Sequence, residues 1–172
     1  MITTRRAVLQ PTLLALLVLA LAAPAAAAAA AWRGWDQGLA EAKAKDKPVL
    51  VDVYTDWCGW CRRMDRDVYA REDVRASLEK RFVPVKLNAE AGDPASYRGK
   101  EFTSRSLASG FRVTGYPTTI FLRPSGDHIV NVPGYIPADR FLLLLEFIGD
   151  GHMDRGVDFQ EFSKKAASGA RP

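Results

Sequence analysis

The architecture of this chain depends most on Val51-Asp52-Val53-Tyr54-Thr55-Asp56-Trp57-Cys58-Gly59-Trp60-Cys61. Residues 49–54 are almost continuously apolar and β-branched, which predicts a buried central strand. Asp52 is the exception inside that run. Two cysteines follow directly, and residues 62–69 then read as a helix. The segment therefore predicts a strand that turns into a helix, with Cys58 at the start of the helix.

The elements on either side follow the order of an α/β domain. Residues 35–46 read as an amphipathic helix that Pro48 ends. Further helices are expected at 72–80 and 103–109, and a last one runs through 141–148, with Pro137 in its first turn and Gly149 as its cap. Strands are expected at 82–87, 118–122 and 129–132. A loop or insertion is expected at 89–101, and a hairpin turn at 124–127. A crossover makes the first two strands parallel, and the last hairpin is antiparallel. The sequence therefore predicts a mixed four- to five-stranded sheet flanked by helices.

Residues 1–31 have the layout of a secretory signal peptide. Arg5 and Arg6 form a positive start, residues 13–23 are apolar, and an alanine tract offers small-residue cleavage sites. An uncleaved membrane anchor is the alternative, which Pro24 and the weakly apolar alanines disfavour. The two arginines are compatible with either Sec or twin-arginine export. The sequence therefore predicts an exported protein, in a bacterium a periplasmic one.

About 140 residues remain after cleavage, the size of one compact domain. The 172-residue chain has a net charge of +4, and the signal peptide removes two arginines and no acidic residue. Without a dense basic patch interleaved with aromatics, nucleic-acid binding is not expected. Residues 32–149 form the expected domain. Residues 150–172 are expected as an extension that is partly helical, through Val157, Phe159 and Phe162, and disordered at its end.

Only two cysteines occur, three positions apart. A loop this short constrains the unfolded chain very little, so a structural disulfide framework is disfavoured. A zinc site is disfavoured because His128 and His152 lie in segments with no evident reach to the pair. Haem attachment needs a histidine directly after the second cysteine, where Arg62 stands. The pair is therefore interpreted as redox chemistry that needs neither a metal nor a cofactor.

Several motifs together make the sequence resemble the thioredoxin family. Residues 51–61 resemble its active-site segment, Val113-Thr114-Gly115-Tyr116-Pro117-Thr118 resembles its cis-proline loop, and Gly126 and Gly134 fall at glycine positions of the family. The resemblance covers roughly residues 35–149 and is greatest to periplasmic thiol:disulfide interchange proteins. It implies the thioredoxin fold. Two departures are the Gly59-Trp60 dipeptide, where cytosolic thioredoxins usually have Gly-Pro, and a longer segment at 88–106.

A thiolate is the nucleophile of thiol–disulfide exchange, and the start of a helix stabilises it. Cys58 is therefore the expected nucleophile, and Cys61, one turn further and more buried, the expected resolving thiol. The resemblance implies that Asp52 lies beneath the second cysteine and exchanges protons with it. It likewise matches Lys86 to a lysine that interacts with this aspartate. The expected catalytic residues are thus Cys58, Cys61 and Asp52.

The resemblance also implies a substrate-binding surface around the cysteines. Pro117 is expected to be cis and to pack against the pair, leaving the backbone of Tyr116 free to pair with an extended substrate. Trp57, Gly59 and Trp60 flank Cys58 and are expected to complete this surface. Arg62 and Arg63 add positive charge nearby, although charged helix faces are commonly just solvated.

These expectations describe an exported thiol–disulfide oxidoreductase. The buried acid favours a reductant or electron carrier that reduces protein disulfides and is recharged by a membrane electron relay of the DsbD type. A disulfide oxidase or isomerase remains open. So does a non-enzymatic module that binds a partner or Cu(I) through its two thiolates.

Overall fold

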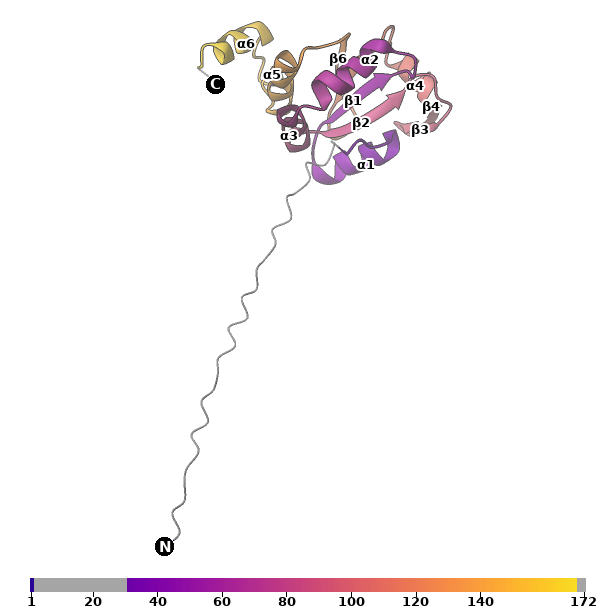
Figure 1. The fold of residues 1–172 in the computed structure, drawn as a ribbon. Coiled ribbons are helices and arrows are strands. Elements are labelled where there is room, and N and C mark those ends of the chain that lie inside the picture. Colours follow the sequence, from indigo (N-terminus) through magenta and orange to yellow (C-terminus); the bar gives the residue numbers. More distant parts are fainter. Residues whose placement is uncertain (2–30, 170–172) are drawn as a thin grey trace.

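The computed structural model describes Met1 and residues 31–169. The expected signal peptide therefore lies almost wholly outside the described residues, as do the final residues 170–172. The elements are, in chain order, α1 (Trp35–Lys45), β1 (Val49–Tyr54), α2 (Gly59–Met64), the π-helical turn η1 (Asp65–Tyr69), α3 (Glu72–Arg81), β2 (Val83–Asn88), β3 (Pro94–Tyr97), β4 (Lys100–Thr103), α4 (Ser104–Gly110), β5 (Thr118–Leu122), β6 (His128–Pro133), α5 (Ala138–Gly149) and α6 (Phe159–Ala167) (Figure 1).

The main sheet has four strands in the order β2-β1-β5-β6. β1 and β2 are parallel, whereas β5 runs antiparallel to both β1 and β6. Arg33 extends the sheet by one parallel bridge to Val85 on the outer edge of β2. The predicted mixed sheet flanked by helices is confirmed.

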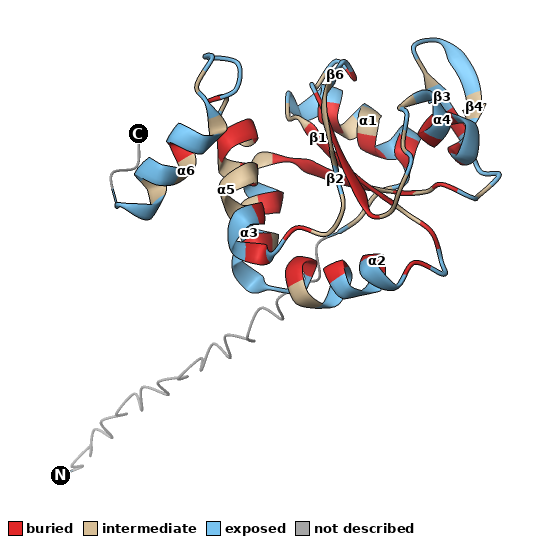
Figure 2. Cartoon of the chain, turned by 90° about the horizontal axis from the view of Figure 1, so that it is seen from above, coloured by how far each residue is buried: buried red, intermediate tan, exposed pale blue. Residues whose placement is uncertain are grey.

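The two faces of the sheet carry separate cores. Alternation along β1 places Val49, Val51 and Val53 in a core shared with α1 and α4. Leu50 points to the opposite face, where it packs among residues of α2, η1, α3 and α5. Figure 2 shows the sheet in the middle, with α1 on one side and α2 on the other. Asp52 has the same parity as Leu50, so it faces the side on which α2 lies.

Residues 89–101 were expected to form a loop or insertion, and the expectation of a loop is wrong. β3 and β4 pair there as an antiparallel hairpin. Its turn uses two positive φ angles, 51° at Arg98 and 73° at Gly99, as tight two-residue hairpins require. Ala95 is fully buried, and the Tyr97 hydroxyl donates to the Gly126 carbonyl (3.0 Å). The hairpin is therefore fastened to the domain through β3.

The two ends of α5 differ from the expectation. Pro137 precedes the helix as its N-cap instead of occupying the first turn, and Gly149 is the last helical residue instead of the cap. A Cβ on Gly149 would lie 2.8 Å from the Cβ of Arg81 and 3.0 Å from the Phe82 ring. The glycine is thus required by close packing against α3, not by the backbone conformation of a helix end.

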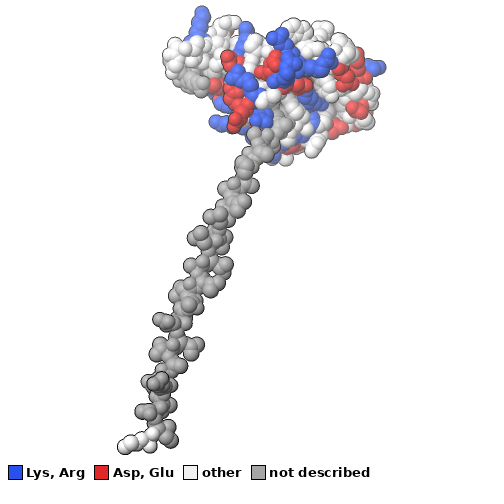
Figure 3. All heavy atoms as spheres, viewed as in Figure 1, with Lys and Arg blue, Asp and Glu red and all other residues white. Residues whose placement is uncertain are grey.

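Residues 150–169 contain one helix, α6. Asp158 caps α6 by accepting from the N–H groups of Gln160 and Glu161, both at 2.9 Å, and Phe162 is fully buried against the core. Over residues 31–169, the helices are all too short or too polar to cross a bilayer. On the face drawn in Figure 3, basic and acidic side chains are interspersed.

Candidate redox site

Cys58 and Cys61 are joined by a disulfide at the point where β1 leads into α2. Cys58 has an extended backbone and is the N-cap of α2, and its sulfur accepts from the Cys61 N–H (3.0 Å). The preceding turn is closed by the Cys58 N–H, which donates to the Thr55 carbonyl (3.2 Å). A helix N-terminus favours negative charge. The Cys61 N–H therefore stabilises a thiolate at Cys58 once the disulfide is reduced.

The expected difference in burial between the two cysteines is not observed. Each is 4 % exposed in the disulfide-bonded state. A substrate therefore has to approach Cys58 across the residues that surround it.

Asp52 lies in the middle of β1 and is only 2 % exposed. Its strand neighbours are Lys86 on β2 and Thr119 on β5. One carboxylate oxygen, Oδ2, pairs with Lys86 Nζ at 3.0 Å, while Oδ1 has no hydrogen-bond partner among the described residues. Burial raises the pKa of the Asp52 carboxyl, and Lys86 opposes this shift without cancelling it.

Lys86 is shared between two carboxylates. Besides Asp52, its ammonium pairs with Asp65 (2.5 Å), which lies in η1 four residues after Cys61. Burial lowers the pKa of Lys86, but the charge of Asp52 and the bonds to both carboxylates outweigh it, so the pKa is raised. Lys86 therefore stays protonated beside Asp52 throughout the neutral range.

Tyr69, at the end of η1, closes the same buried cluster. Burial, followed by the charge of Asp52, raises its pKa well above the usual range, so the phenol remains neutral. Its hydroxyl makes no hydrogen bond of normal geometry with the described residues. Oδ1 of the buried Asp52 carboxylate has no hydrogen-bond partner among the described residues, and Lys86 and the neutral Tyr69 lie beside it. This carboxylate can therefore take up and release a proton with little rearrangement.

The opposite side of the cysteine pair is exposed and aromatic. Trp60, between the cysteines, is 54 % exposed and packs on Tyr135 with ring centroids 5.5 Å apart. The Arg63 guanidinium lies over both rings, 5.1 Å from Trp60 and 5.4 Å from Tyr135. Gly59, Trp60 and Arg63 line a shallow, mostly apolar hollow of about 210 Å³. This hollow adjoins Cys58.

A second exposed indole lies on the other side of Cys58. Trp57 is 64 % exposed; its Nε1 donates to Glu90 (2.9 Å) and its ring meets Tyr116 edge-on at 6.0 Å. The Tyr116–Pro117 bond is cis, as the resemblance implies, and Pro117 is buried. The structure thus brings the five residues expected to bind substrate to one end of the sheet: Trp57, Gly59, Trp60, Tyr116 and Pro117.

Sequence reasoning missed several members of the site. Asp65 had a usable signal, because a residue four positions after Cys61 lies on the same helix face. Tyr69, eight positions after Cys61 in the helix expected at 62–69, had the same signal. Tyr135 and Glu90 had none, since they reach the site through tertiary packing. Within residues 31–169, no group of three or more His, Cys, Asp or Glu side chains is arranged to hold a metal ion.

A C-x-x-C disulfide at a helix start, in a chain that also has a cis-proline loop and a buried carboxylate in the preceding strand, is typical of the class of thiol–disulfide oxidoreductases. A family model described as a thioredoxin-like domain matches residues 35–149. The chain belongs to this thioredoxin-like family.

Curated relatives and solved structures agree with that assignment. The chain is 37% identical over 109 residues to thiol:disulfide interchange protein DsbD 2 of Pseudomonas aeruginosa, covering 62% of this chain and 17% of that protein. It is 31% identical over 112 residues to DsbD of Ralstonia nicotianae, covering 64% and 17%. The chain thus spans about a sixth of the length of these relatives.

Two solved structures share the fold over most of their length. One is a thioredoxin-fold protein from Helicobacter pylori, with a TM-score of 0.63 and 25% identity, covering 72% of this chain and 82% of that one. The other is a thioredoxin from Thermus thermophilus, with a TM-score of 0.61 and 26% identity, covering 76% and 95%.

Proposed function

We propose that this protein is an exported reductant that reduces disulfides in substrate proteins through Cys58 and Cys61. The observation that carries the proposal is the buried Asp52, which lies on the α2 side of β1 and whose pKa is raised by burial. A base with a raised pKa is suited to accept a thiol proton near neutral pH. Cys61, fully covered, needs such a base to ionise.

The cycle starts from the dithiol form. The Cys58 thiolate attacks one sulfur of a substrate disulfide, a mixed disulfide forms, and the first substrate thiolate leaves. Asp52 takes the proton of Cys61, whose thiolate then attacks the Cys58 sulfur. The Cys58–Cys61 disulfide forms and the second substrate thiolate leaves. Two electrons pass to the substrate, and its two thiolates are protonated from Asp52 and solvent.

The aromatic surface supports a protein substrate. Trp57, Gly59, Trp60, Tyr116 and Pro117 flank Cys58, and Trp57 and Trp60 are the most exposed large apolar side chains between residues 31 and 169. Exposed tryptophans are typical anchors of protein interfaces. An extended substrate segment lying along Tyr116 then presents its disulfide to Cys58.

The direction of electron flow is tested by the reduction potential of the Cys58–Cys61 couple, measured in glutathione or dithiothreitol buffers. We expect a value below about −220 mV, on the side of thioredoxin at about −270 mV. A value near about −120 mV, as for strong oxidants, would make the protein a disulfide donor instead. Stoichiometric copper binding without insulin reduction would overturn the enzymatic proposal itself.

Export and the electron donor are part of the proposal. The layout of residues 1–31 supports cleavage close to Trp32, and the names of the relatives support a donor of the DsbD type. N-terminal sequencing of the purified protein checks the first point. Thiol trapping in cells with and without the membrane relay checks the second, since loss of the relay should leave Cys58 and Cys61 oxidised.

A further inference from the structure

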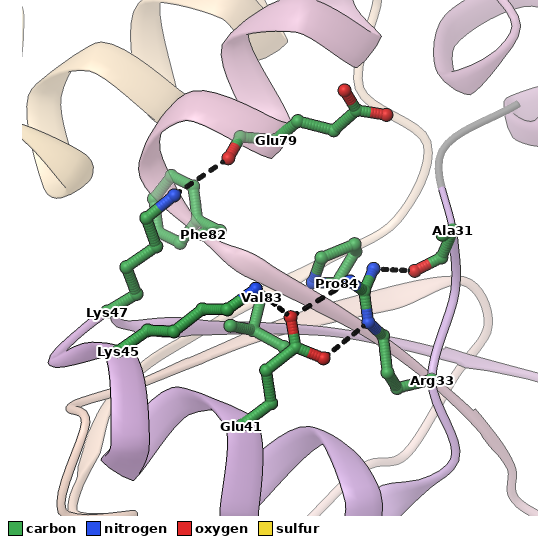
Figure 4. Close-up of a pocket in the computed structure, with 9 residues that line it drawn as sticks. All are labelled: Ala31, Arg33, Glu41, Lys45, Lys47, Glu79, Phe82, Val83 and Pro84. Carbon is green, nitrogen blue, oxygen red and sulfur yellow. Dashed lines mark hydrogen bonds and ion pairs between the residues drawn. The ribbon is translucent and has the colours of Figure 1, made fainter. Parts of the chain in front are cut away.

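The segment ahead of α1 is fixed to the outer edge of β2. The Arg33 N–H donates to the Pro84 carbonyl, and the Arg33 carbonyl accepts from the Lys86 N–H, both at 3.0 Å. Its guanidinium makes two bonds to the Glu41 carboxylate, at 2.8 and 2.9 Å, and Lys45 approaches the same carboxylate from the other side (Figure 4). The backbone directly after Trp32 is therefore held beside the strand that carries Lys86.

The indole of Trp32 contacts the cluster around Asp52. Lys86 Nζ lies 5.1 Å from the centre of this ring, and Tyr69 meets it edge-on at 4.9 Å. Tyr54 and Tyr69 approach the same ammonium at 5.0 and 5.7 Å. Aromatic faces attract cations. The ammonium thus lies among aromatic rings, with its two carboxylate partners on the remaining sides.

We propose that Trp32 is a positioning residue of the redox site, whose indole holds the Lys86 ammonium on the Asp52 carboxylate and covers that ion pair. This inference rests on the proposed function, because it matters only if Asp52 serves Cys61. Nothing in the reaction touches Trp32. Its effect passes through Lys86 to Asp52.

The direction of the effect follows from the groups that face Asp52. These are Lys86 from β2, Asp65 and Tyr69 from η1, and Tyr54 from β1, with Asp56 acting on Tyr54. Burial is the largest cause of the raised pKa of Asp52. Removing the indole admits water to the pair, so the pKa of Asp52 should fall, and the more mobile Lys86 opposes this change only in part.

The test is the pH dependence of the step in which Cys61 resolves the mixed disulfide, followed in single-turnover reduction of insulin by the full-length mature protein. In Trp32→Ala the midpoint that reports Asp52 should move to lower pH by about half a unit or more. Trp32→Phe, which keeps an aromatic face, should restore most of the wild-type profile. Phe159→Ala removes another half-buried ring from the same core, remote from Lys86, and should leave the midpoint unchanged.

Asp52→Asn is measured in parallel and separates two kinds of failure. If it abolishes the midpoint while Trp32→Ala keeps the wild-type profile, the role of Trp32 is wrong and the proposed function stands. If Asp52→Asn leaves the midpoint in place, the role of Trp32 and the role of Asp52 as the base for Cys61 are both overturned. A midpoint that moves equally in Trp32→Ala and Phe159→Ala reports general loosening of the core and also overturns the role of Trp32.

Discussion

The two sides of the Cys58–Cys61 disulfide differ in almost every physical respect. On the inner side, Asp52, Lys86 and Tyr69 form a buried, charged cluster whose members are held by strands and by η1. On the outer side, Trp57 and Trp60 are more than half exposed and carry no charge of their own. The inner side can set when a thiol ionises, whereas the outer side can set which protein is bound.

This difference makes the two regions separable by experiment. Changes inside should alter pH dependence and stability, and changes outside should alter substrate affinity while leaving both untouched. The cysteines belong to both regions, so their replacement should affect the reaction most.

Replacing the cysteines should have the largest effect. Cys58→Ser should lower insulin reduction on the order of 1000-fold or more, because a hydroxyl does not replace the thiolate nucleophile. Cys61→Ser should still attack but should accumulate the mixed disulfide, which mass spectrometry detects. A Cys58→Ser variant that traps substrate as well as Cys61→Ser does would reverse the roles assigned to the two sulfurs.

The next largest effect is expected inside, at Asp52. In Asp52→Asn the resolution step should slow by about 100-fold at neutral pH, the usual contribution of a general base. The rate of the initial attack by Cys58 should change much less. Stopped-flow measurement of both steps checks this, with Asp46→Asn as the control, because Asp46 is an exposed carboxylate at the end of α1, before β1, whereas the cysteines follow β1. Equal slowing of the two steps would contradict the assignment of Asp52 to Cys61.

A smaller effect is expected outside, at Trp60. Trp60→Ala removes the anchor that packs on Tyr135 and should raise the KM for a protein substrate about tenfold, or about 1.4 kcal/mol. The pH midpoint that reports Asp52 should stay as in the wild type, because no contact to Asp52 or Lys86 is lost. Met153→Ala removes another exposed apolar side chain, from the segment between α5 and α6, and should change neither quantity. A shifted midpoint in Trp60→Ala would break the separation of the two sides.

How much of this arrangement could be predicted from sequence depends on whether a local pattern reports it. The strand before Cys58, the parallel pair and the final hairpin follow from local patterns, namely apolar runs, a crossover and turn residues. The parity of Asp52 with Leu50 follows from the period of a strand. What could not be predicted is which residues from distant parts of the sequence meet at the site. Trp32 and Tyr135 lie near the two ends of residues 32–149, and no local pattern reports their contacts with Lys86 and Trp60.

The hairpin of β3 and β4 shows a second limit. Residues 94–103 are mostly exposed and polar, with glycine and proline, which is the usual composition of a loop. Their pairing depends on the burial of Ala95 and on the bond from Tyr97 to Gly126, both tertiary contacts. Composition therefore identified an insertion but not its structure.

A further effect is expected on stability, and it tests whether burying the Asp52 carboxylate costs the folded protein free energy. The pKa of Asp52 in the folded protein lies above the ordinary value of 3.8, so folding favours the protonated form. Stability from this group is fully present below pH 3.8 and is lost as the pH rises through the folded pKa. The asparagine of Asp52→Asn cannot ionise, so the variant has no such loss. The attraction between Lys86 and the Asp52 carboxylate is already contained in the raised pKa of Asp52.

The variant should therefore be more stable than the wild type at neutral pH, by about 1.4 kcal/mol for each unit by which the pKa is raised. The difference should disappear in acid. Urea unfolding of oxidised protein at several pH values measures it, with Asp46→Asn again as the control. A pH-independent difference would mean that packing, not the buried charge, separates the two proteins. Trp60→Ala should show no such pH-dependent gain, because Trp60 is exposed and its replacement removes no buried charge. A gain in Asp52→Asn alone would distinguish the buried carboxylate of the inner side from the binding surface of the outer side.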